Sequence, residues 1–540
     1  MRSLRREPAL LLALLAVAAL VLLFIVYPQL QVVLTPGPGG YVQFFQEGTW
    51  FIPLRNSVQL TLLSTTTAVL LGFIYAYAMV YSNMRWKPFF RLIGILPLLS
   101  PPFVVAAAYT LLFGARGVIS YGVFGQSPNI YGLNGVWGVQ TIAFFPFAYQ
   151  LIADALSRSD PRMEQAAHNL GAGSWRVFRT VTLPLARPGL GAAILTTAIY
   201  ILEDFGNPQL VGGVFYVLPT QAYSLISGFG EYTSAAAVST ILLVLAFGLY
   251  IAKIRLDGGR SFVTISGRAS SMPRPPVSAA VSRACFVACL ALAGLILLVY
   301  GSLVVSALTL RFPNNLQFTT EHFQYVLSGT NGDALRNTLV FSGIAAAFSA
   351  IFALFAGWLV QRGTWPGRGA LDLLLILPAA IPGIFFGLGY VTAFNQRWLD
   401  FVDRGWLIII AFVFWNIPVG YQAAVAGLRQ IDRSIDEAAT SLGASSLRGF
   451  REVVLPMLGG SLRVGFITTF VRAVTTLSLV IFLFTPPTTV ATIRIYQLVG
   501  DLNWGAATAY TVADIGMAII ALSIFAVVAR GRIALGAARA

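Results

Sequence analysis

The residues of this chain whose chemistry is most informative are a few charged side chains within long apolar runs. Glu203 and Asp204 stand near the end of one run, Arg472 lies about ten residues into another, and Asp514 lies within the last. A charge at the centre of a bilayer costs about 2.5–3.5 kcal/mol on insertion scales, so each should face a helix bundle or a partner. Two interpretations stay open for these residues: a structural ion pair, or a polar constriction on a translocation path.

The sequence holds no recognisable catalytic or nucleotide-binding motif. No Gly-x-x-x-x-Gly-Lys-Ser/Thr occurs and neither lysine follows a glycine, so the chain cannot bind ATP through a phosphate-binding loop. The two histidines, His168 and His322, have no evident partners for a metal or a catalytic triad. Cys285 and Cys289 lie four residues apart in one apolar run, where packing explains them better than a disulfide or a metal. We expect no catalytic residue and no metal site.

Composition places the chain in a membrane. Of its 540 residues, 57% are hydrophobic and only 10% are charged, with a mean hydropathy of +0.78. A soluble domain carries about 25% charged residues. The net charge of +15 comes from basic residues in short segments between apolar runs. That distribution follows the positive-inside rule and argues against a nucleic-acid-binding surface.

Twelve apolar runs are long enough to cross a bilayer, which takes about 20 helical residues. They are residues 8–34, 57–81, 92–114, 136–156, 188–207, 236–255, 284–308, 337–361, 370–394, 407–428, 463–484 and 506–529. With the N-terminus inside, the cytoplasmic segments hold 27 of the 35 Lys and Arg residues, the outer segments hold seven, and Arg472 lies within a span. This asymmetry predicts a multi-pass protein with both termini in the cytoplasm.

A polar segment between apolar runs is duplicated. Residues 164–184 (EQAAHNLGAGSWRVFRTVTLP) and 436–456 (DEAATSLGASSLRGFREVVLP) align without a gap and are identical at 12 of 21 positions. Each copy reads as two short helices joined at a hinge, and we name them the first elbow (160–186) and the second elbow (432–458). A small-residue stripe on such an elbow, held at a membrane surface, suits docking in a partner's groove.

Local signals place the caps and the hinge of each elbow. Aspartate is favoured as an N-cap, glycine breaks a helix at its C-terminal end, and serine can cap the helix that follows. In this order, the predicted residues are Asp160, Gly171 and Ser174 in the first elbow and Asp432, Gly443 and Ser446 in the second. The residues expected to dock are Glu164, Ala166, Ala167, Gly171, Asp436, Glu437, Ala438, Ala439 and Gly443.

The match between the two halves of the chain extends beyond the elbows. Ile95-Leu96-Pro97 in the first half corresponds to Ile376-Leu377-Pro378 in the second. Six spans separate equivalent points, an even number, so the halves share one topology and are parallel repeats. We predict a first six-helix half at 1–255, a Gly-, Ser- and Pro-rich cytoplasmic linker at 256–283, and a second six-helix half at 284–540.

The repeat also suggests which intramembrane charges could meet. Tyr200 occupies the position equivalent to Arg472 and lies one helical turn before Glu203-Asp204. If equivalent helices face each other across a pseudo-two-fold axis, Glu203 or Asp204 lies near Arg472, with Asp514 as the rival partner. The residues predicted to line a path are Tyr200, Glu203, Asp204, Arg472 and Asp514.

The E-A-A-(three residues)-G pattern with a downstream L-P resembles the EAA loop of binding-protein-dependent ATP-binding-cassette (ABC) importer permeases. The first copy departs slightly, reading Glu-Gln-Ala-Ala where the second reads Asp-Glu-Ala-Ala. The resemblance implies the type I ABC importer permease fold, an all-α integral membrane protein of twelve transmembrane helices in two parallel six-helix repeats. In that family the elbow is a coupling helix that inserts into the ATP-hydrolysing subunit.

Asp204–Pro208 (DFGNP) and Phe470–Leu483 (FVRAVTTLSLVIFL) look most like ferric-iron importer permeases. The resemblance implies a permease subunit of the bacterial inner membrane, surrounded by lipid, that receives its substrate from an extracytoplasmic binding protein. Two copies of an ATPase subunit would bind ATP and Mg, so this chain would be no enzyme and would carry no cofactor. Thiamine, phosphonate, polyamine and sulfate are alternative substrates, and an ion-coupled secondary transporter is the alternative from another class.

Overall fold

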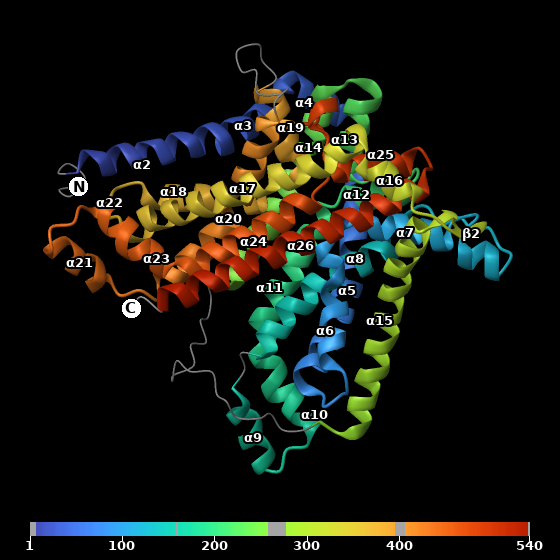
Figure 1. Cartoon of the computed structure of the whole chain (residues 1–540), viewed down its shortest axis with the longest axis horizontal. Coiled ribbons are helices and arrows are strands. Elements are labelled where there is room, and N and C mark those ends of the chain that lie inside the picture. Colours follow the sequence, from blue (N-terminus) through green and yellow to red (C-terminus); the bar gives the residue numbers. More distant parts are fainter. Residues whose placement is uncertain (1–6, 158–159, 258–276, 395–404, 538–540) are drawn as a thin grey trace. The chain divides into compact units, whose positions relative to one another are not determined.

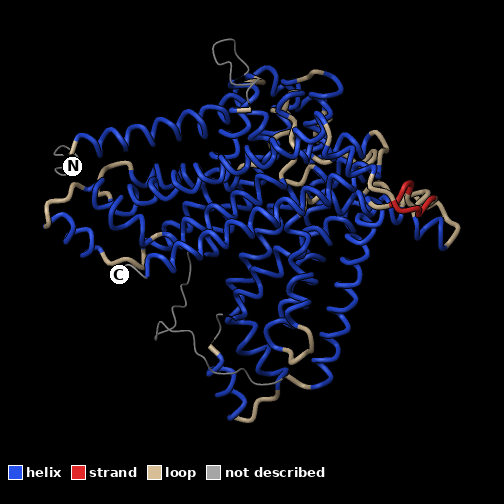
Figure 2. Tube along the Cα trace, in the orientation of Figure 1, coloured by secondary structure: helices blue, strands red, loops and turns tan. Residues whose placement is uncertain are grey.

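The computed structural model describes residues 7–157, 160–257, 277–394 and 405–537. Helix dominates the trace (Figure 2), and the chain divides into two compact units (Figure 1). Unit 1 comprises Met1–Gln43, Gly230–Thr240 and Thr320–Ala540, and unit 2 comprises Phe44–Phe229 and Ile241–Thr319. The chain therefore enters each unit more than once, and the units do not follow chain order.

Unit 2 contains the first elbow and the following elements, in chain order: α5 (Phe51–Tyr81), α6 (Lys87–Ile95), η2 (Leu96–Leu99), α7 (Phe103–Phe113), η3 (Val118–Val123), α8 (Leu133–Ser157), α9 (Pro161–Asn169), α10 (Ser174–Val177), η4 (Phe178–Thr182), α11 (Leu183–Leu202), α12 (Gly206–Val211), α13 (Leu218–Phe229), α15 (Ala279–Ala307), β1 (Thr309–Arg311) and β2 (Asn315–Phe318). The two short strands pair antiparallel, a ribbon that the sequence pattern did not predict.

Unit 1 contains the second elbow and these elements: α2 (Pro8–Val21), η1 (Leu22–Val26), α3 (Tyr27–Leu34), α16 (Glu321–Leu327), α17 (Gly329–Arg362), α18 (Arg368–Ile376), η5 (Leu377–Ala380), α19 (Gly383–Phe394), α20 (Trp406–Leu428), α21 (Arg433–Ser441), α22 (Ser446–Gly449), η7 (Phe450–Val454), α23 (Leu455–Met457), α24 (Gly459–Thr475), η8 (Pro486–Thr488), α25 (Ala491–Gly500) and α26 (Trp504–Ala537). Two helices cross the division between the units, α4 (Gly37–Glu47) and α14 (Tyr232–Asp257).

The same three-helix core occurs in each unit. In unit 2, α5 packs against α8 and α11, and in unit 1 the equivalent helix α17 packs against α20 and α24. Small residues allow the close approach: a Cβ at Gly72 of α5 would lie 2.8 Å from the Ala148 Cβ of α8, and one at Gly420 of α20 would lie 3.0 Å from the Ala353 Cβ of α17. Such small-residue contacts are typical of helix packing in membranes.

Each core is covered by a long helix from the start of a sequence half. In unit 2 that helix is α15, which packs against α5, α6 and α7. In unit 1 it is the N-terminal segment, in which α2 contacts α18 and α22, and α3 contacts α19. The first helix of each predicted half therefore packs in the unit that holds the elbow of the other half.

Within the described residues, ten helices are long and apolar enough to cross a membrane, or up to twelve if each of two bent helix pairs is one span. The predicted class, an all-α integral membrane protein with up to twelve spans, is confirmed. The bent pairs are Arg368–Ala380 with Gly383–Phe394, at 111°, and Ser446–Met457 with Gly459–Thr475, at 74°.

Three predicted spans are wrong in detail. The span expected at 370–394 is broken between Ala380 and Gly383, at the 111° bend. The span expected at 92–114 breaks at Ser100-Pro101-Pro102, because consecutive prolines remove two backbone donors, and the helix resumes at Phe103. The span expected at 463–484 ends at Thr475. The chain then runs on as buried irregular backbone, close enough to α19 that a Cβ at Gly387 would lie 2.4 Å from the Leu479 carbonyl oxygen. Irregular backbone at membrane depth is tolerated where protein covers it.

Candidate functional site: two elbows and buried charges

The first helix of the first elbow, α9, begins and ends at the predicted residues. The Asp160 carboxylate accepts a hydrogen bond from the Arg162 N–H at 3.0 Å and so caps α9. Gly171 adopts φ +83°, a left-handed conformation that favours glycine. Its N–H donates to the His168 carbonyl at 2.9 Å, and the Ala172 N–H donates to the Ala167 carbonyl at 3.1 Å. These two bonds form a Schellman motif, which satisfies the last carbonyls of α9.

The second elbow repeats this geometry. The Asp432 carboxylate accepts from the Ser434 N–H at 2.8 Å, and this hydrogen bond holds the pKa of Asp432 below its usual value. Gly443 adopts φ +84°, and the Ala444 N–H donates to the Ala439 carbonyl at 3.0 Å. The predicted caps Asp160 and Asp432 and the predicted hinges are confirmed.

The prediction that Ser174 and Ser446 cap the second helix of each elbow is wrong. Each serine is instead the first helical residue, and the caps are Gly173 and Ser445, one position earlier. The Ser445 hydroxyl accepts from the Arg448 N–H at 3.4 Å. Ser446 is therefore free for a different contact: its hydroxyl donates to one carboxylate oxygen of Glu7 at 2.8 Å, and its N–H donates to the other at 3.1 Å.

The acidic position of each elbow faces inward. Glu164 is only 2% exposed, and its Oε1 accepts from the Tyr81 hydroxyl at 2.7 Å and from the Thr182 hydroxyl at 3.0 Å. Asp436, at the equivalent position, forms an ion pair with the Arg362 Nε at 2.9 Å. Tyr81 and Arg362 are the last residues of α5 and α17. Each elbow is thus tied to the end of a core helix of its own unit.

Other predicted docking residues lie on the outer surface. Ala166, Gly171, Glu437, Ala438 and Gly443 are exposed, and Ala167 and Ala439 are half-buried. A Cβ at either hinge glycine would meet no atom within 4 Å. The most exposed apolar residues of the elbows are Leu170 and Leu442, each 89% exposed. Both belong to the predicted stripe, although the predicted docking set does not include them. Both elbows carry leucine at this position, and this identity was the signal in the sequence that could have identified them as docking residues.

Asp204 is the centre of a buried polar cluster in unit 2. It follows α11, and its Oδ2 accepts from the Gln140 Nε2 and the Asn207 Nδ2, each at 2.9 Å. The Asn207 N–H adds a bond of 3.4 Å to Oδ1. Glu203 beside it is half-buried. Of the predicted path residues in this unit, Tyr200 lies on α11 and packs its ring 4.5 Å from that of Phe147.

Arg472 and Asp514 lie in unit 1 and are not brought together. The Arg472 guanidinium carbon lies 4.6 Å from the ring centroid of Trp415, a cation–π contact. Asp514 is 1% exposed, and its Oδ1 has no hydrogen-bond partner. Since Glu203 and Asp204 belong to the other unit, their pairing with Arg472 stays a prediction. In the described part of the chain, no group of three or more His, Cys, Asp or Glu side chains is placed to hold a metal ion.

Two equivalent sets of membrane helices, each with a capped elbow tied to its core, define a multi-pass membrane transport permease. The chain belongs to the family described as binding-protein-dependent transport system inner membrane component, whose model matches it twice, at residues 68–255 and 349–534. The two matches agree with the predicted pair of repeats and with the predicted family.

The chain is similar in sequence to several curated proteins. The chain is 32% identical over 515 residues to the ferric transport system permease protein FbpB of Actinobacillus pleuropneumoniae, covering 92% of this chain and 75% of that protein. It is 32% identical over 516 residues to a protein of Haemophilus influenzae that is also named a ferric transport system permease, covering 90% and 79%. A sulfate transport system permease protein of Salmonella typhimurium is 30% identical over 207 residues, covering 36% of this chain and 74% of that protein.

Proposed function

We propose that this chain is the permease subunit of an ABC importer that moves ferric iron, delivered by an extracytoplasmic binding protein, into the cytoplasm. Family membership supports the dependence on a binding protein. The two relatives named for ferric transport support the substrate, because each aligns with at least 90% of the chain. The match to a sulfate permease covers only 36% of the chain. It therefore supports the fold of one half of the chain and says little about the substrate.

The single observation that carries the proposal is the pair of elbows with matching caps, hinges and inward anchors. Two such elbows supply two docking sites, one for each of two ATPase subunits that bind ATP and Mg. The sequence has no phosphate-binding loop of its own. The exposed surface of each elbow, with Leu170 or Leu442 beside the hinge glycine, supplies an apolar knob that fits a partner's groove.

The anchors give a physical route from the elbows to the pore. In this mechanism, closure of the ATPase pair pushes both elbows together. The Glu164–Tyr81 hydrogen bond and the Asp436–Arg362 ion pair pass the displacement to α5 and α17. Because each of these helices packs against two others of its unit, each core moves as a rigid body and access alternates between the two sides. The excess of basic residues in the segments on the elbow side supports a cytoplasmic position for the elbows and both termini.

Asp204 and Glu203 are the carboxylates that we assign to the pathway, with Tyr200, Arg472 and Asp514 as further path residues. Ferric iron is a hard cation that favours oxygen ligands. The amide groups of Gln140 and Asn207 hold the Asp204 carboxylate in place through hydrogen bonds. In this role Asp204 is a transient contact and not a resident metal site.

Reconstitution tests the proposal directly. Vesicles would contain the chain with or without the ATPase, and the binding protein would be loaded with radioactive ferric iron. We expect iron to accumulate only when both the ATPase and ATP are present. Iron uptake without any ATPase would contradict the ABC mechanism and favour a secondary transporter. ATP-driven uptake of sulfate but not iron would leave the mechanism intact and overturn the substrate.

A further inference from the structure

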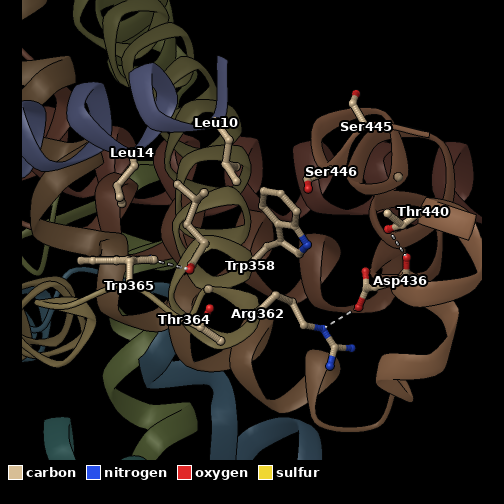
Figure 3. A pocket seen from close by; sticks show the side chains of 13 residues that line it. Leu10, Leu14, Trp358, Arg362, Thr364, Trp365, Asp436, Thr440, Ser445 and Ser446 are labelled. Carbon is tan, nitrogen blue, oxygen red and sulfur yellow. Dashed lines mark hydrogen bonds and ion pairs between the residues drawn. The ribbon is translucent and has the colours of Figure 1, made fainter. Parts of the chain in front are cut away.

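A cavity of about 230 Å³ lies within unit 1, between α2, the end of α17 and the second elbow (Figure 3). Its apolar wall includes Leu10 and Leu14 of α2 and Trp358 of α17. Thr440 and the Arg362–Asp436 ion pair line the opposite side. The cavity therefore has an apolar end and a polar end, as ligand sites commonly do.

Trp358 brings an unpaired donor to this cavity. Its side chain is 5% exposed, and its Nε1 has no hydrogen-bond partner. Figure 3 shows that the indole nitrogen faces the side of the cavity where Asp436 and Thr440 lie. Buried polar groups are paired in the great majority of cases. By contrast, Trp365, which also lines the cavity, donates its Nε1 hydrogen to the Leu359 carbonyl at 3.2 Å.

The charged groups around Trp358 form an ion pair with each other. Arg362 pairs with Asp436 through Nε at 2.9 Å and donates to the Ile431 carbonyl at 2.7 Å. The Thr440 hydroxyl donates to the Asp436 carbonyl at 2.8 Å. The charges of Arg362 and Asp436 balance each other, so this wall favours neither an anion nor a cation. The Trp358 N–H lacks a hydrogen bond, and so do the Arg362 Nε and the Asp436 Oδ2 of the ion pair. Because an indole nitrogen can only donate, the Trp358 N–H requires an acceptor.

We propose that this cavity binds a small uncharged amphiphile, with an acceptor oxygen on the Trp358 N–H and a hydrocarbon chain along Leu10 and Leu14. The volume of about 230 Å³ is several times the share of one water molecule in the liquid, about 30 Å³. A ligand in this position contacts both α2 and the second elbow, beside the existing Glu7–Ser446 hydrogen bonds.

Equilibrium binding of tritiated octanamide to the full-length chain tests this site. The chain would be placed in nanodiscs of diether phospholipids, whose glycerol linkages carry no carbonyl group, and empty nanodiscs would give the partition background. We expect saturable binding at one site per chain. Octylammonium, which has the same chain length but only donors, should not compete, because it cannot accept the Trp358 hydrogen.

Three variants locate the binding. Trp358→Phe keeps a ring but removes the N–H, and we expect about tenfold weaker binding, the usual effect of one hydrogen bond. Leu10→Trp fills the apolar end and should abolish saturable binding. Trp137→Phe is the matched control, because this indole lies in unit 2 and donates to the Thr67 hydroxyl. Elution as a single species, as for wild type, would establish that each variant is folded.

The proposal is overturned if octanamide shows no saturable binding, if octylammonium competes equally, or if Trp358→Phe binds octanamide as tightly as wild type. Diester phospholipids identify the source of the natural ligand. Weaker octanamide binding in diester nanodiscs means that a lipid ester carbonyl occupies the same site. Unchanged binding means that the ligand is a free amphiphile, and both results support the acceptor chemistry.

Discussion

Glu164 and Asp436 occupy the same position in the two elbows but are held by different chemistry. Glu164 is buried and accepts two hydroxyl hydrogen bonds, whereas Asp436 is only partly buried and pairs with a guanidinium. The partners Tyr81 and Arg362 are equivalent in the same register that relates Ile95 to Ile376. The duplicated position has thus kept an anchoring role while the partner changed from a neutral side chain to a charged one.

Removing the first anchor should loosen the elbow more than changing an exposed acid. Glu164→Ala removes the acceptor of the hydrogen bonds from the Tyr81 and Thr182 hydroxyls, each worth about 0.5–1.5 kcal/mol, whereas Glu164→Gln keeps an acceptor oxygen. We expect thermal stability and iron uptake per ATP hydrolysed to be highest in wild type, lower in Glu164→Gln and lowest in Glu164→Ala. Glu231→Gln, at an exposed position outside the elbows, is the control. Equal uptake by wild type and Glu164→Ala would show that the anchor transmits nothing.

The proposed pathway carboxylates can be tested with variants of nearly the same shape. In Asp204→Asn the side-chain oxygen can still accept from the Gln140 and Asn207 side chains, so the losses are the charge and the 3.4 Å bond from the Asn207 N–H. We expect iron uptake to fall at least about tenfold in Asp204→Asn and to fall in Glu203→Gln, because the hard cation loses the negative charge of its oxygen ligands. Asp501→Asn, at an exposed position, should transport normally. Wild-type rates in both test variants would remove these residues from the mechanism.

At the scale of the elements, the elbow is a short capped helix that turns at a left-handed glycine. Both copies have an aspartate N-cap on the first helix, nearly the same φ at the hinge glycine and the same two C-terminal hydrogen bonds. The two copies belong to different halves of the chain. The hinge glycines have open space around them, so no neighbouring atom requires glycine there. The positive φ is the feature that favours glycine at both hinges.

Substitution at the hinge separates membrane insertion from coupling. Gly171→Asp and Gly443→Asp should leave the chain in the membrane, while uptake falls at least about tenfold and ATP hydrolysis continues. The cause is the strain of a left-handed non-glycine residue, about 1 kcal/mol or more, together with a charge on the docking surface. Uptake and hydrolysis would be measured on the same vesicles.

Two further variants separate the effect of backbone strain from the effect of the added charge. Gly171→Ala introduces the strain alone. Gly173→Asp places the same charge two residues away at φ −65°, where no strain arises. Unchanged uptake in both hinge aspartate variants would count against docking at the elbows.

Local signals made the elbows predictable, and long-range contacts could not be predicted in the same way. Asp160 and Gly171 act on backbone groups within five residues, so their types and spacing were sufficient. The contact of Glu164 with Tyr81 joins residues 83 positions apart, and hydropathy cannot reveal it. The register between the two halves did link Tyr81 with Arg362, but equivalence between two residues does not say what either one touches.

Apolar composition also hid the breaks in the membrane helices. Residues 476–485 are as apolar as a membrane-spanning helix, so the hydropathy pattern predicted a span that continued through them. The close approach of α19 at Gly387 accommodates irregular backbone there. Prolines 101 and 102 were visible in the sequence, but a proline within an apolar run can either kink a helix or end it.

For the whole molecule, the orientation in the membrane is the first property to measure. In a background with Cys285→Ser and Cys289→Ser, Leu442→Cys tests the second elbow, and Val214→Cys tests the segment after α12. Both positions are strongly exposed. A membrane-impermeant maleimide should label Leu442→Cys only in inside-out vesicles and Val214→Cys only in right-side-out vesicles, because basic segments stay in the cytoplasm. The reverse pattern would invert the topology and remove the elbows from the ATPase side.

The exchange of first helices has a mechanical consequence for a chain that is cut in two. Residues 1–257 would supply α2 and α3 to unit 1, and residues 277–540 would supply the whole of α15 to unit 2. If the two fragments dissociated, each unit would lose a helix that packs in it, so we expect the fragments to stay associated. Co-expressed fragments should therefore purify together through a tag on either one, with no covalent link between them.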